Sequence, residues 1–171
     1  GDTYGYGTVT VVQETDLVAR TLVRHYPPCN HLTFDENGKA TEDFEAVIIG
    51  FGQVGQTVLR HLVMNGQFEG STFRAAVFSP DCNSVKGYFT KSYAQVLRQY
   101  DISFHACDAR CEAIYDYLQE RGGRIKYLAI CTGSDRLNQE IAEDLTEYLS
   151  QRNIPMGAYL CSHRGVKCFD P

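Results

Sequence analysis

Short apolar runs alternate with amphipathic stretches over most of the chain. We predict strands at the apolar runs 46–49, 73–79, 102–107, 125–131 and 156–161. Residues 125–131 are almost continuously apolar, as in a strand buried on both faces. We predict helices after 55 and at about 91–100, 110–121 and 136–151, with a loop over 80–87. The stripe in the last of these helices is formed by Leu137, Ile141, Leu145 and Leu149, and Ser134 or Asp135 is its predicted N-cap.

This alternation predicts the fold class. Repeated strand–helix units of this length form parallel sheets with right-handed crossovers and helices on both faces. We therefore expect an α/β, doubly wound, mainly parallel sheet of the Rossmann-like type over residues 45–171.

Residues 1–44 form a predicted N-terminal extension. We expect a strand at 8–12, a helix at 15–25 and a hairpin whose arms are 31–34 and 39–44. Asn37-Gly38 at the hairpin tip favours a type I′ turn. We expect this segment to pack beside the Rossmann-like unit, as a sheet edge or as a connection to a neighbouring domain.

The strand at 46–49 runs directly into Gly50-x-Gly52-x-x-Gly55, which opens a helix. In this context Gly50 permits a tight turn, Gly52 lets a pyrophosphate approach the backbone, and Gly55 lets helix and strand pack closely. The N–H groups and the positive dipole end of the helix would face the phosphates. Nucleotide binding is therefore the leading functional prediction.

Composition narrows the classes of partner. The chain has 171 residues, of which 43% are hydrophobic and 22% charged, with a formal net charge of −5. Without a strongly basic stretch, nucleic acid is not an expected partner. The longest apolar runs are far shorter than a membrane span, and the pattern of a signal peptide is missing. The odd number of cysteines, seven, predicts a reducing cytoplasmic location rather than a disulfide framework.

The residues at the predicted strand ends resemble a known family. The matching stretches are Ile48-Ile49-Gly50-Phe51-Gly52-Gln53-Val54-Gly55, Cys107-Asp108-Ala109 and Ala129-Ile130-Cys131-Thr132-Gly133-Ser134-Asp135-x-x-Asn138. Together they are similar to the nucleotide-binding TrkA-N or RCK N-terminal domain of bacterial potassium-transport regulators. The resemblance covers about residues 44–161.

The resemblance implies a cytoplasmic nucleotide sensor rather than an enzyme. In such a domain NAD(H) or an adenine nucleotide shifts the geometry of a homodimer, which gates an attached membrane channel or transporter. Asp108 and Ala109 would lie near the adenine, and Thr132 and Gly133 would line the inner cleft. The phosphates would be held by Gly50, Phe51, Gly52, Gln53, Val54 and Gly55. The resemblance implies neither a catalytic residue nor a metal site.

This sequence departs from the family at the end of the second strand. The family usually has an acid there for the ribose hydroxyls, whereas this chain has Ser79, with Asp81 two residues later. Ser79, Asn83 and Lys86 could instead suit the 2′-phosphate of NADP, or a different nucleotide such as AMP or ATP.

Residues 8–23 resemble the last strand and helix of a preceding unit of the same kind. On that resemblance we expect this chain to be a segment of a longer protein.

Three alternatives to the sensor stay open. A fragment of an NAD(P)-dependent oxidoreductase would have its catalytic residues elsewhere, since a dehydrogenase also needs a substrate domain. A methyltransferase uses a glycine-rich first turn, although this motif suits a dinucleotide better. A Rossmann module without a ligand would act as an assembly interface.

Two groups of cysteine and histidine carry a weaker signal. Cys107-x-x-x-Cys111 with His105 is open to interpretation as a metal or redox site, but we interpret the two cysteines as buried thiols beside the sheet. Cys161-x-His163-x-x-x-x-Cys168 does not match a standard zinc spacing.

Overall fold

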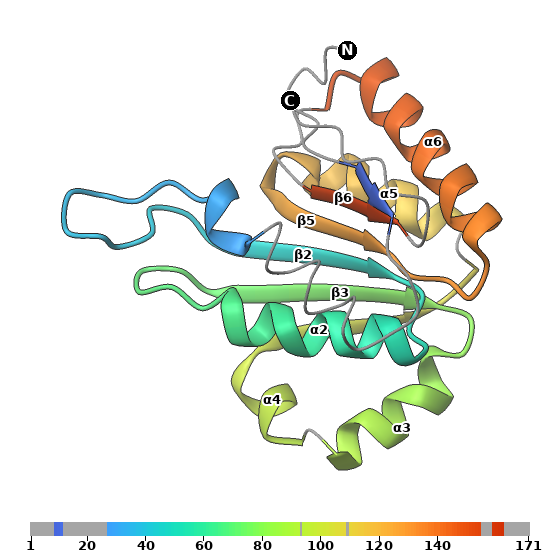
Figure 1. The fold of residues 1–171 in the computed structure, drawn as a ribbon, viewed down its shortest axis with the longest axis horizontal. Helices are drawn as coiled ribbons and strands as arrows, with labels where there is room; N and C mark the ends of the chain where they lie inside the picture. The colour runs from blue at the N-terminus through green and yellow to red at the C-terminus, as the bar shows by residue number, and fades with distance from the viewer. Residues whose placement is uncertain (1–8, 12–26, 93, 109, 155–158, 163–171) are drawn as a thin grey trace.

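A six-stranded, entirely parallel sheet forms the centre of the molecule (Figure 1). The computed structural model describes residues 9–11, 27–92, 94–108, 110–154 and 159–162. The strand order across the sheet is β1-β6-β5-β2-β3-β4. The strands are β1 (Val9–Val11), β2 (Phe44–Ile49), β3 (Phe73–Ser79), β4 (Asp101–Ala106), β5 (Ile125–Ile130) and β6 (Tyr159–Ser162).

This order confirms the doubly wound fold. From β2 the chain adds β3 and then β4 on one side, and it then crosses back to add β5 and β6 on the other. β1 occupies the place that a sixth strand takes in the Rossmann order. The order reverses between β2 and β5, and the crevice at their carboxyl ends is where ligands bind in such sheets.

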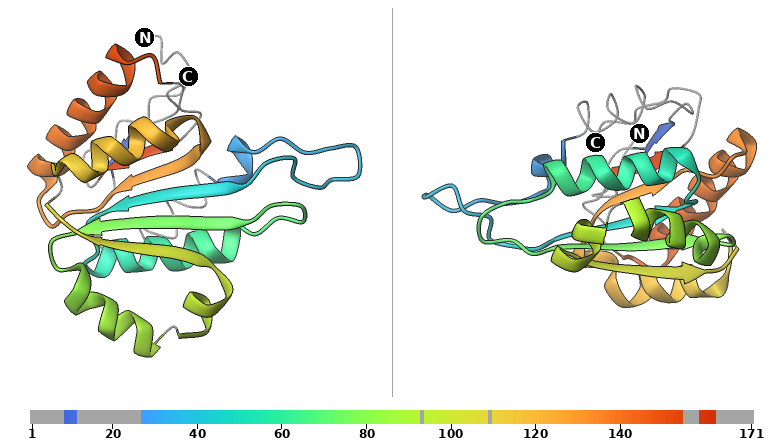
Figure 2. Two further views of the ribbon diagram at one scale, coloured as in Figure 1. Left: turned by 180° about the vertical axis from the view of Figure 1, so that it is seen from behind. Right: turned by 90° about the horizontal axis from the view of Figure 1, so that it is seen from below.

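Helices cover both faces of the sheet (Figure 2). On one face the sheet is packed against α2 (Gln53–Asn65) and α4 (Ala94–Gln99). On the other face it is packed against α5 (Glu112–Arg121) and α6 (Asp135–Gln151). The sequence dictates this division because successive side chains of a strand point to opposite faces. In β2, Ala46 and Ile48 belong to the α2 side, whereas Val47 and Ile49 belong to the α5 and α6 side. The remaining helices are α3 (Cys82–Ser92) and the short 3-10 helices η1 (Pro28–His31) and η2 (Gly122–Arg124).

Most predicted boundaries are confirmed within two residues. β3 coincides with the predicted range, β2 begins two residues earlier, and β4 is shifted by one residue. Ser134 is the N-cap of α6, since its hydroxyl accepts a hydrogen bond from the N–H of Leu137 at 3.2 Å. The predicted helix at 15–25 lies outside the described residues, as do 156–158 of the predicted last strand.

The prediction of a loop over 80–87 is wrong, because α3 begins at Cys82. The turn-forming residues of this stretch suggested a loop. Pro80 and Asp81 form the turn before the helix, whereas Asn83, Ser84 and Gly87 lie exposed within it and the Cys82 side chain is buried. Its sulfur lies 4.0 Å from the carbonyl oxygen of Val77. Burial of the Cys82 thiol therefore helps to anchor the first turn of α3.

The hairpin exists, but its turn is not type I′. Gly38 has a φ of +80°, whereas Asn37 is outside the left-handed region. The Asp35 carboxylate accepts the N–H groups of Asn37 and Lys39, each at 2.9 Å, and its carbonyl accepts that of Gly38 at 3.1 Å. This is a three-residue loop in which glycine takes the left-handed position after a helical turn. The aspartate side chain, rather than Asn37, sets the turn.

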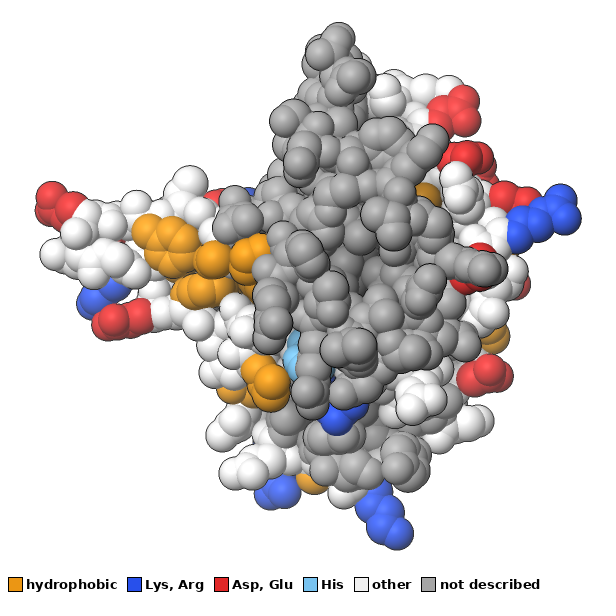
Figure 3. Space-filling model, viewed as in Figure 1, with side chains coloured by type: hydrophobic (Ala, Val, Ile, Leu, Met, Phe, Trp, Pro, Cys, Tyr) orange, Lys and Arg blue, Asp and Glu red, His pale blue; other side chains and the backbone are white. Residues whose placement is uncertain are grey.

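The hairpin projects from the amino ends of β2 and β3 (Figure 1). At its base Phe34 meets the ring of Phe68 edge-on at 5.6 Å. Phe34 remains 41% exposed, and apolar side chains gather on this part of the surface (Figure 3). In the described part of the chain, no helix combines the length and the apolar character needed to cross a membrane.

Candidate functional site at the strand ends

Gly50 makes the turn between β2 and the helix that follows it. Its φ is +95°, a conformation that side-chain-bearing residues rarely adopt. A Cβ at this position would lie 2.5 Å from the carbonyl oxygen of Cys131 at the end of β5. The N–H of Gly50 donates to the carbonyl of Phe78 at 2.8 Å. Gly50 therefore brings the ends of three neighbouring strands together at the point where the strand order reverses.

Gly55 is required by packing within the same turn. A Cβ on Gly55 would lie 2.1 Å from the carbonyl oxygen of Gly50, a distance that no side chain can occupy. The first turn of α2 thus lies directly against the glycine turn. This is the role that the sequence predicted for the third glycine of the motif.

Gly52 differs from these two glycines, because nothing in the described structure requires it. Its φ is −74°, and a Cβ built there would have no atom within 4 Å. Gly52 is the N-cap of α2, but this helix has neither a side-chain cap nor an acidic residue in its first turn. In the described structure the start of α2 therefore has no side-chain cap, and uncapped helix N-termini are positions at which anions bind.

The other residues of the motif contribute unequally. The Phe51 side chain is buried, and its ring meets that of Phe104 edge-on at 5.5 Å. Val54 is also buried, whereas Gln53 is exposed. Phe51 and Val54 could therefore reach a phosphate through their backbone alone, while Gln53 also offers its side chain.

Ser79 and Asp81 lie at the carboxyl end of β3. Ser79 is buried, and its carbonyl accepts the N–H of Cys107 at 3.1 Å. Asp81 is exposed in the turn that enters α3, where its carbonyl accepts the N–H of Ser84 at 3.1 Å. The carboxylate thus lies past the strand end and beside the start of α3.

Asp108 follows β4 and organises the start of α5. Its carboxylate accepts the N–H of Arg110 at 2.9 Å, and its carbonyl accepts the N–H of Cys111 at 3.0 Å. Cys107 and Cys111 are joined by a disulfide, so their interpretation as buried thiols is wrong. Alternation along the strand gave no sign that the sulfurs meet across the turn. Ala109 lies outside the described residues.

Thr132 at the end of β5 is fixed by a buried amide. Its N–H donates to the Asn138 side-chain oxygen at 2.9 Å, and its carbonyl accepts from the Asn138 nitrogen at 3.1 Å. Asn138 is fully buried in the first turns of α6. Gly133 is exposed between them. This side of the crevice is therefore rigid, with the Thr132 backbone already paired.

Two ionisable groups near these strand ends have pKa values shifted by burial. Burial raises the pKa of the Cys131 thiol to about 12. Burial also lowers the pKa of His105, whose ring stacks on Phe78 at 4.5 Å. Within the described ranges, no three His, Cys, Asp or Glu side chains are grouped to hold a metal ion. Cys161, His163 and Cys168 cannot be assessed as a group, because 163–171 lie outside those ranges.

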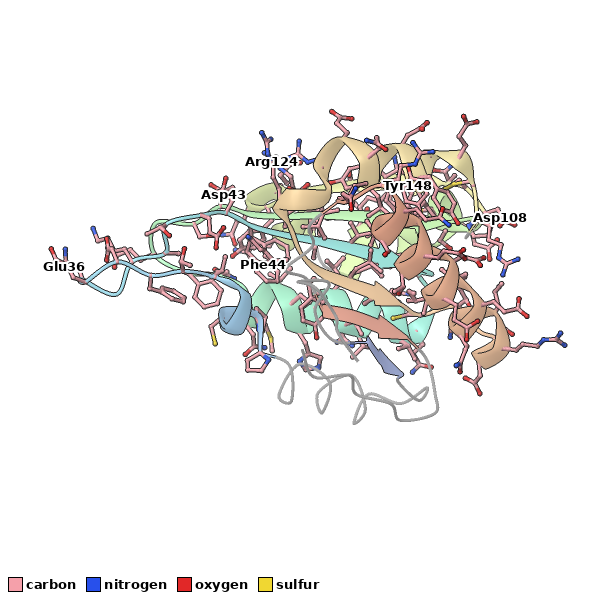
Figure 4. The ribbon with its side chains drawn as sticks, turned by 90° about the horizontal axis from the view of Figure 1, so that it is seen from above. Glu36, Asp43, Phe44, Asp108, Arg124 and Tyr148 are labelled. Atoms are coloured by element: carbon pink, nitrogen blue, oxygen red, sulfur yellow. A yellow bond between two sulfur atoms is a disulfide. The ribbon has the colours of Figure 1, made fainter. Side chains whose placement is uncertain are left out.

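Two cavities in the described structure lie away from the strand ends. One, of about 280 Å³, is formed at the amino ends of β2, β3 and β5 and is lined by charged residues that include Asp43 and Arg124. Asp108 lies at the opposite end of the sheet from these two residues (Figure 4). Another, of about 290 Å³, lies beside Phe68 and Tyr100. Neither includes a residue of the glycine motif, and the candidate site is described by its backbone geometry.

Sequence reasoning missed a buried ion pair beside the charged cavity. Glu45 is 3% exposed, accepts the Tyr117 hydroxyl at 2.7 Å, and is paired with Arg121. A charged residue at the start of an apolar run was the available signal, because a buried carboxylate requires a partner. The partner lies 76 residues further along the chain.

Comparison with protein-family models, with curated proteins and with solved structures finds no match for this chain.

Proposed function

We propose that this chain is a nucleotide-binding regulatory domain, with NAD(H) as its first candidate ligand. The phosphates would lie over Gly52 at the amino end of α2. In this proposal the domain works in the cytoplasm as a homodimer that controls a potassium channel or transporter. The proposal joins the Rossmann-like fold to the motif resemblance described above.

The open space at Gly52 is the observation that carries the proposal. Gly50 and Gly55 are explained by the fold itself, since a Cβ on either would collide with backbone atoms. A Cβ on Gly52 would meet nothing. Between a parallel strand and the N-terminus of the next helix, a glycine that neither φ nor packing requires is expected where a ligand approaches the backbone, and Gly52 has this position whereas Gly87 lies inside α3.

Two side chains at the strand ends favour a regulatory role over a catalytic one. The Asp108 carboxylate is engaged by the N–H of Arg110, and burial raises the pKa of the Cys131 thiol. These groups hold the ends of the strands in place. A ligand that binds two arrangements of such domains unequally shifts the balance between them by its differential affinity.

Ser79 bears on which nucleotide binds. A carboxylate at this position would accept hydrogen bonds from ribose hydroxyls and repel a 2′-phosphate. Ser79 has no charge to repel a 2′-phosphate and offers a ribose one hydroxyl in place of two carboxylate oxygens, and Lys86 on α3 lies over the Phe104 ring, 5.4 Å from its centroid. NADP, AMP and ATP are therefore tested beside NAD(H).

A calorimetric titration of the chain with NAD, NADH, NADPH, AMP, ATP and S-adenosylmethionine tests the proposal. Gly52→Asp places a carboxylate where the phosphates would lie, and aspartate is a good N-cap, so this variant should fold. Gly87→Asp is the matched control, since a Cβ on Gly87 also meets no atom within 4 Å and the residue lies within α3.

Micromolar binding of a nicotinamide or adenine nucleotide, lost in Gly52→Asp and kept in Gly87→Asp, would support the proposal. Binding of S-adenosylmethionine alone would indicate a methyltransferase instead. An absence of binding to all six compounds would contradict the proposal and favour a module that serves assembly. Hydride transfer from bound NADH to a substrate would favour the oxidoreductase fragment.

A further inference from the structure

The Cys107–Cys111 disulfide links the end of β4 to the start of α5. Cys107 follows the last residue of β4, and Cys111 is the N-cap of α5. Their Cα atoms are 6.1 Å apart, within the usual range for a disulfide. The bond closes a short turn that contains Asp108 and Arg110.

Hydrogen bonds connect this turn to the candidate nucleotide site. The N–H of Cys107 donates to the carbonyl of Ser79, at the position where a ribose would be recognised. Asp108, expected beside the adenine, uses its carboxylate and its carbonyl to hold the N–H groups of Arg110 and Cys111. The disulfide is thus connected by short contacts to both residues at the nucleoside side of the site.

The two bonded cysteines are more accessible than the buried thiols of the described chain. Cys82 and Cys131 are buried, and burial raises the pKa of each thiol. Cys107 and Cys111 are partly exposed at the edge of the core. Buried thiols react poorly, whereas exposed disulfides are the ones that external thiols reach. Among the described cysteines this accessible disulfide stands beside the buried thiols of Cys82 and Cys131, and exposed disulfides are the more easily reduced, regulatory kind.

We propose that Cys107 and Cys111 are a reversible redox modification site that controls nucleotide affinity. This inference rests on the proposed function. The disulfide form restricts the Asp108 turn before the nucleotide arrives, and reduction removes this covalent restraint while the hydrogen bonds of Asp108 and the Arg110 contacts to α6 remain. Because a preorganised site loses less freedom on binding, the disulfide form binds the nucleotide more tightly.

Thiol–disulfide exchange with glutathione can both break and re-form the Cys107–Cys111 bond. A glutathione thiolate attacks one sulfur of the Cys107–Cys111 bond, which breaks to give a mixed disulfide and a protein thiolate. A second glutathione thiolate then attacks the mixed disulfide and releases the other protein thiolate with oxidised glutathione. Two electrons pass to the protein, whose thiolates take up protons from water, and oxidised glutathione reverses the sequence.

The amino end of α5 stabilises the thiolate that this exchange forms at Cys111. A thiolate released at Cys111 lies at the N-cap of a ten-residue helix, where N–H groups and the helix dipole stabilise negative charge. The side chain of the neighbouring Arg110 is paired with Glu140 and Asp144 on α6. The turn therefore has a second anchor on α6 that does not depend on the disulfide.

The test compares the oxidised and reduced forms of the whole chain. The protein is equilibrated with oxidised or reduced glutathione, alkylated, and mapped by mass spectrometry so that Cys107 and Cys111 are scored separately from the other cysteines. Parallel samples are titrated with NAD, NADH, AMP and ATP. Cys107→Ser and Cys111→Ser remove the bond, and Cys29→Ser, an exposed thiol in η1, is the control.

We expect the oxidised protein to bind its nucleotide about fivefold or more tightly than the reduced protein. Both serine variants at the pair should match the reduced protein under either condition, and Cys29→Ser should match the wild type. The wild-type comparison needs no substitution, so it stands even where a variant fails to fold.

Other outcomes would overturn the inference in distinguishable ways. Equal affinity in the two forms, with binding still lost in Gly52→Asp, would reject redox control and leave the proposed function standing. Labelling of Cys107 and Cys111 as thiols in oxidised glutathione would also reject redox control alone. An absence of nucleotide binding in both forms would reject the proposed function and the redox control together.

Discussion

The carboxylate of Glu45 and the guanidinium of Arg121 form an ion pair that joins the start of β2 to the end of α5. One guanidinium nitrogen lies 3.1 Å from Glu45 Oε2, and the Tyr117 hydroxyl donates to Oε1 at 2.7 Å. Burial and the hydrogen bond to Glu45 raise the pKa of Tyr117. The tyrosine thus remains a neutral donor, and the pair fixes α5 on its face of the sheet.

Glu45→Gln should lower the free energy of unfolding by about 2 kcal/mol or more, because Arg121 then keeps its charge without a counter-ion in a partly buried site. Urea denaturation would measure the change. Arg136→Gln is the control, since Arg136 is 91% exposed in its pair with Glu140 and should change stability by less than about 0.5 kcal/mol. Equal effects of the two substitutions would contradict this assignment.

Gly55→Ala should prevent stable folding or lower stability by several kcal/mol, because its Cβ would lie 2.1 Å from the Gly50 carbonyl oxygen. Gly52→Ala should cost less than about 1 kcal/mol, because its Cβ enters open space and only a weaker N-cap results. Thermal unfolding of the two variants gives the comparison. A Gly55→Ala protein as stable as Gly52→Ala would show that the glycine turn is less tightly packed than described.

Asn138→Ala should lower the free energy of unfolding by about 2–3 kcal/mol, because the N–H and carbonyl of Thr132 lose their buried partner. Asn138→Asp retains an oxygen acceptor for the N–H, but it introduces a buried negative charge beside the Thr132 carbonyl and should also destabilise. Denaturation of both variants in urea measures these changes. If either variant kept wild-type stability, the amide would not be what holds the end of β5.

His105 should make stability depend on pH. Burial lowers its pKa below the ordinary value of 6.5, so the unfolded chain takes up a proton that the folded chain resists. The contribution of neutral His105 to the free energy of unfolding is therefore constant above about pH 7. It is lost as the pH falls through 6.5 toward the pKa of His105 in the folded chain. His105→Phe keeps a ring against Phe78 but cannot titrate. Urea midpoints between pH 5 and 8 should diverge for the two proteins at the acidic end, and parallel curves would refute the prediction.

The centre of the sheet was predictable because β2, β3 and β5 are buried on both faces. Residues such as Ile48 and Leu128 leave no polar alternation, and the helix stripe from Leu137 to Leu149 has a period that fits one face. These signals are local, and they specify which segments form elements. The roles of Gly50 and Gly55 followed from the same local context.

Features set by distant contacts were not predictable. The start of α3 depends on the burial of Cys82 beneath β3, and the hairpin turn depends on which hydrogen bonds Asp35 makes. The Glu45–Arg121 pair depends on how α5 lies across the sheet. For the candidate site, the sequence located the glycine turn between β2 and α2, but the disulfide became visible only in three dimensions.

The parallel pairing of β1 with β6 has a consequence for how the chain acquires its structure. Val9 lies opposite Leu160, so this outer pair joins segments about 150 residues apart. During synthesis β1 emerges first, yet the strand that it pairs with emerges after every other strand of the sheet. β1 can therefore pair only after β6 is available. During refolding, hydrogen exchange should show that the amides of β1 become protected last.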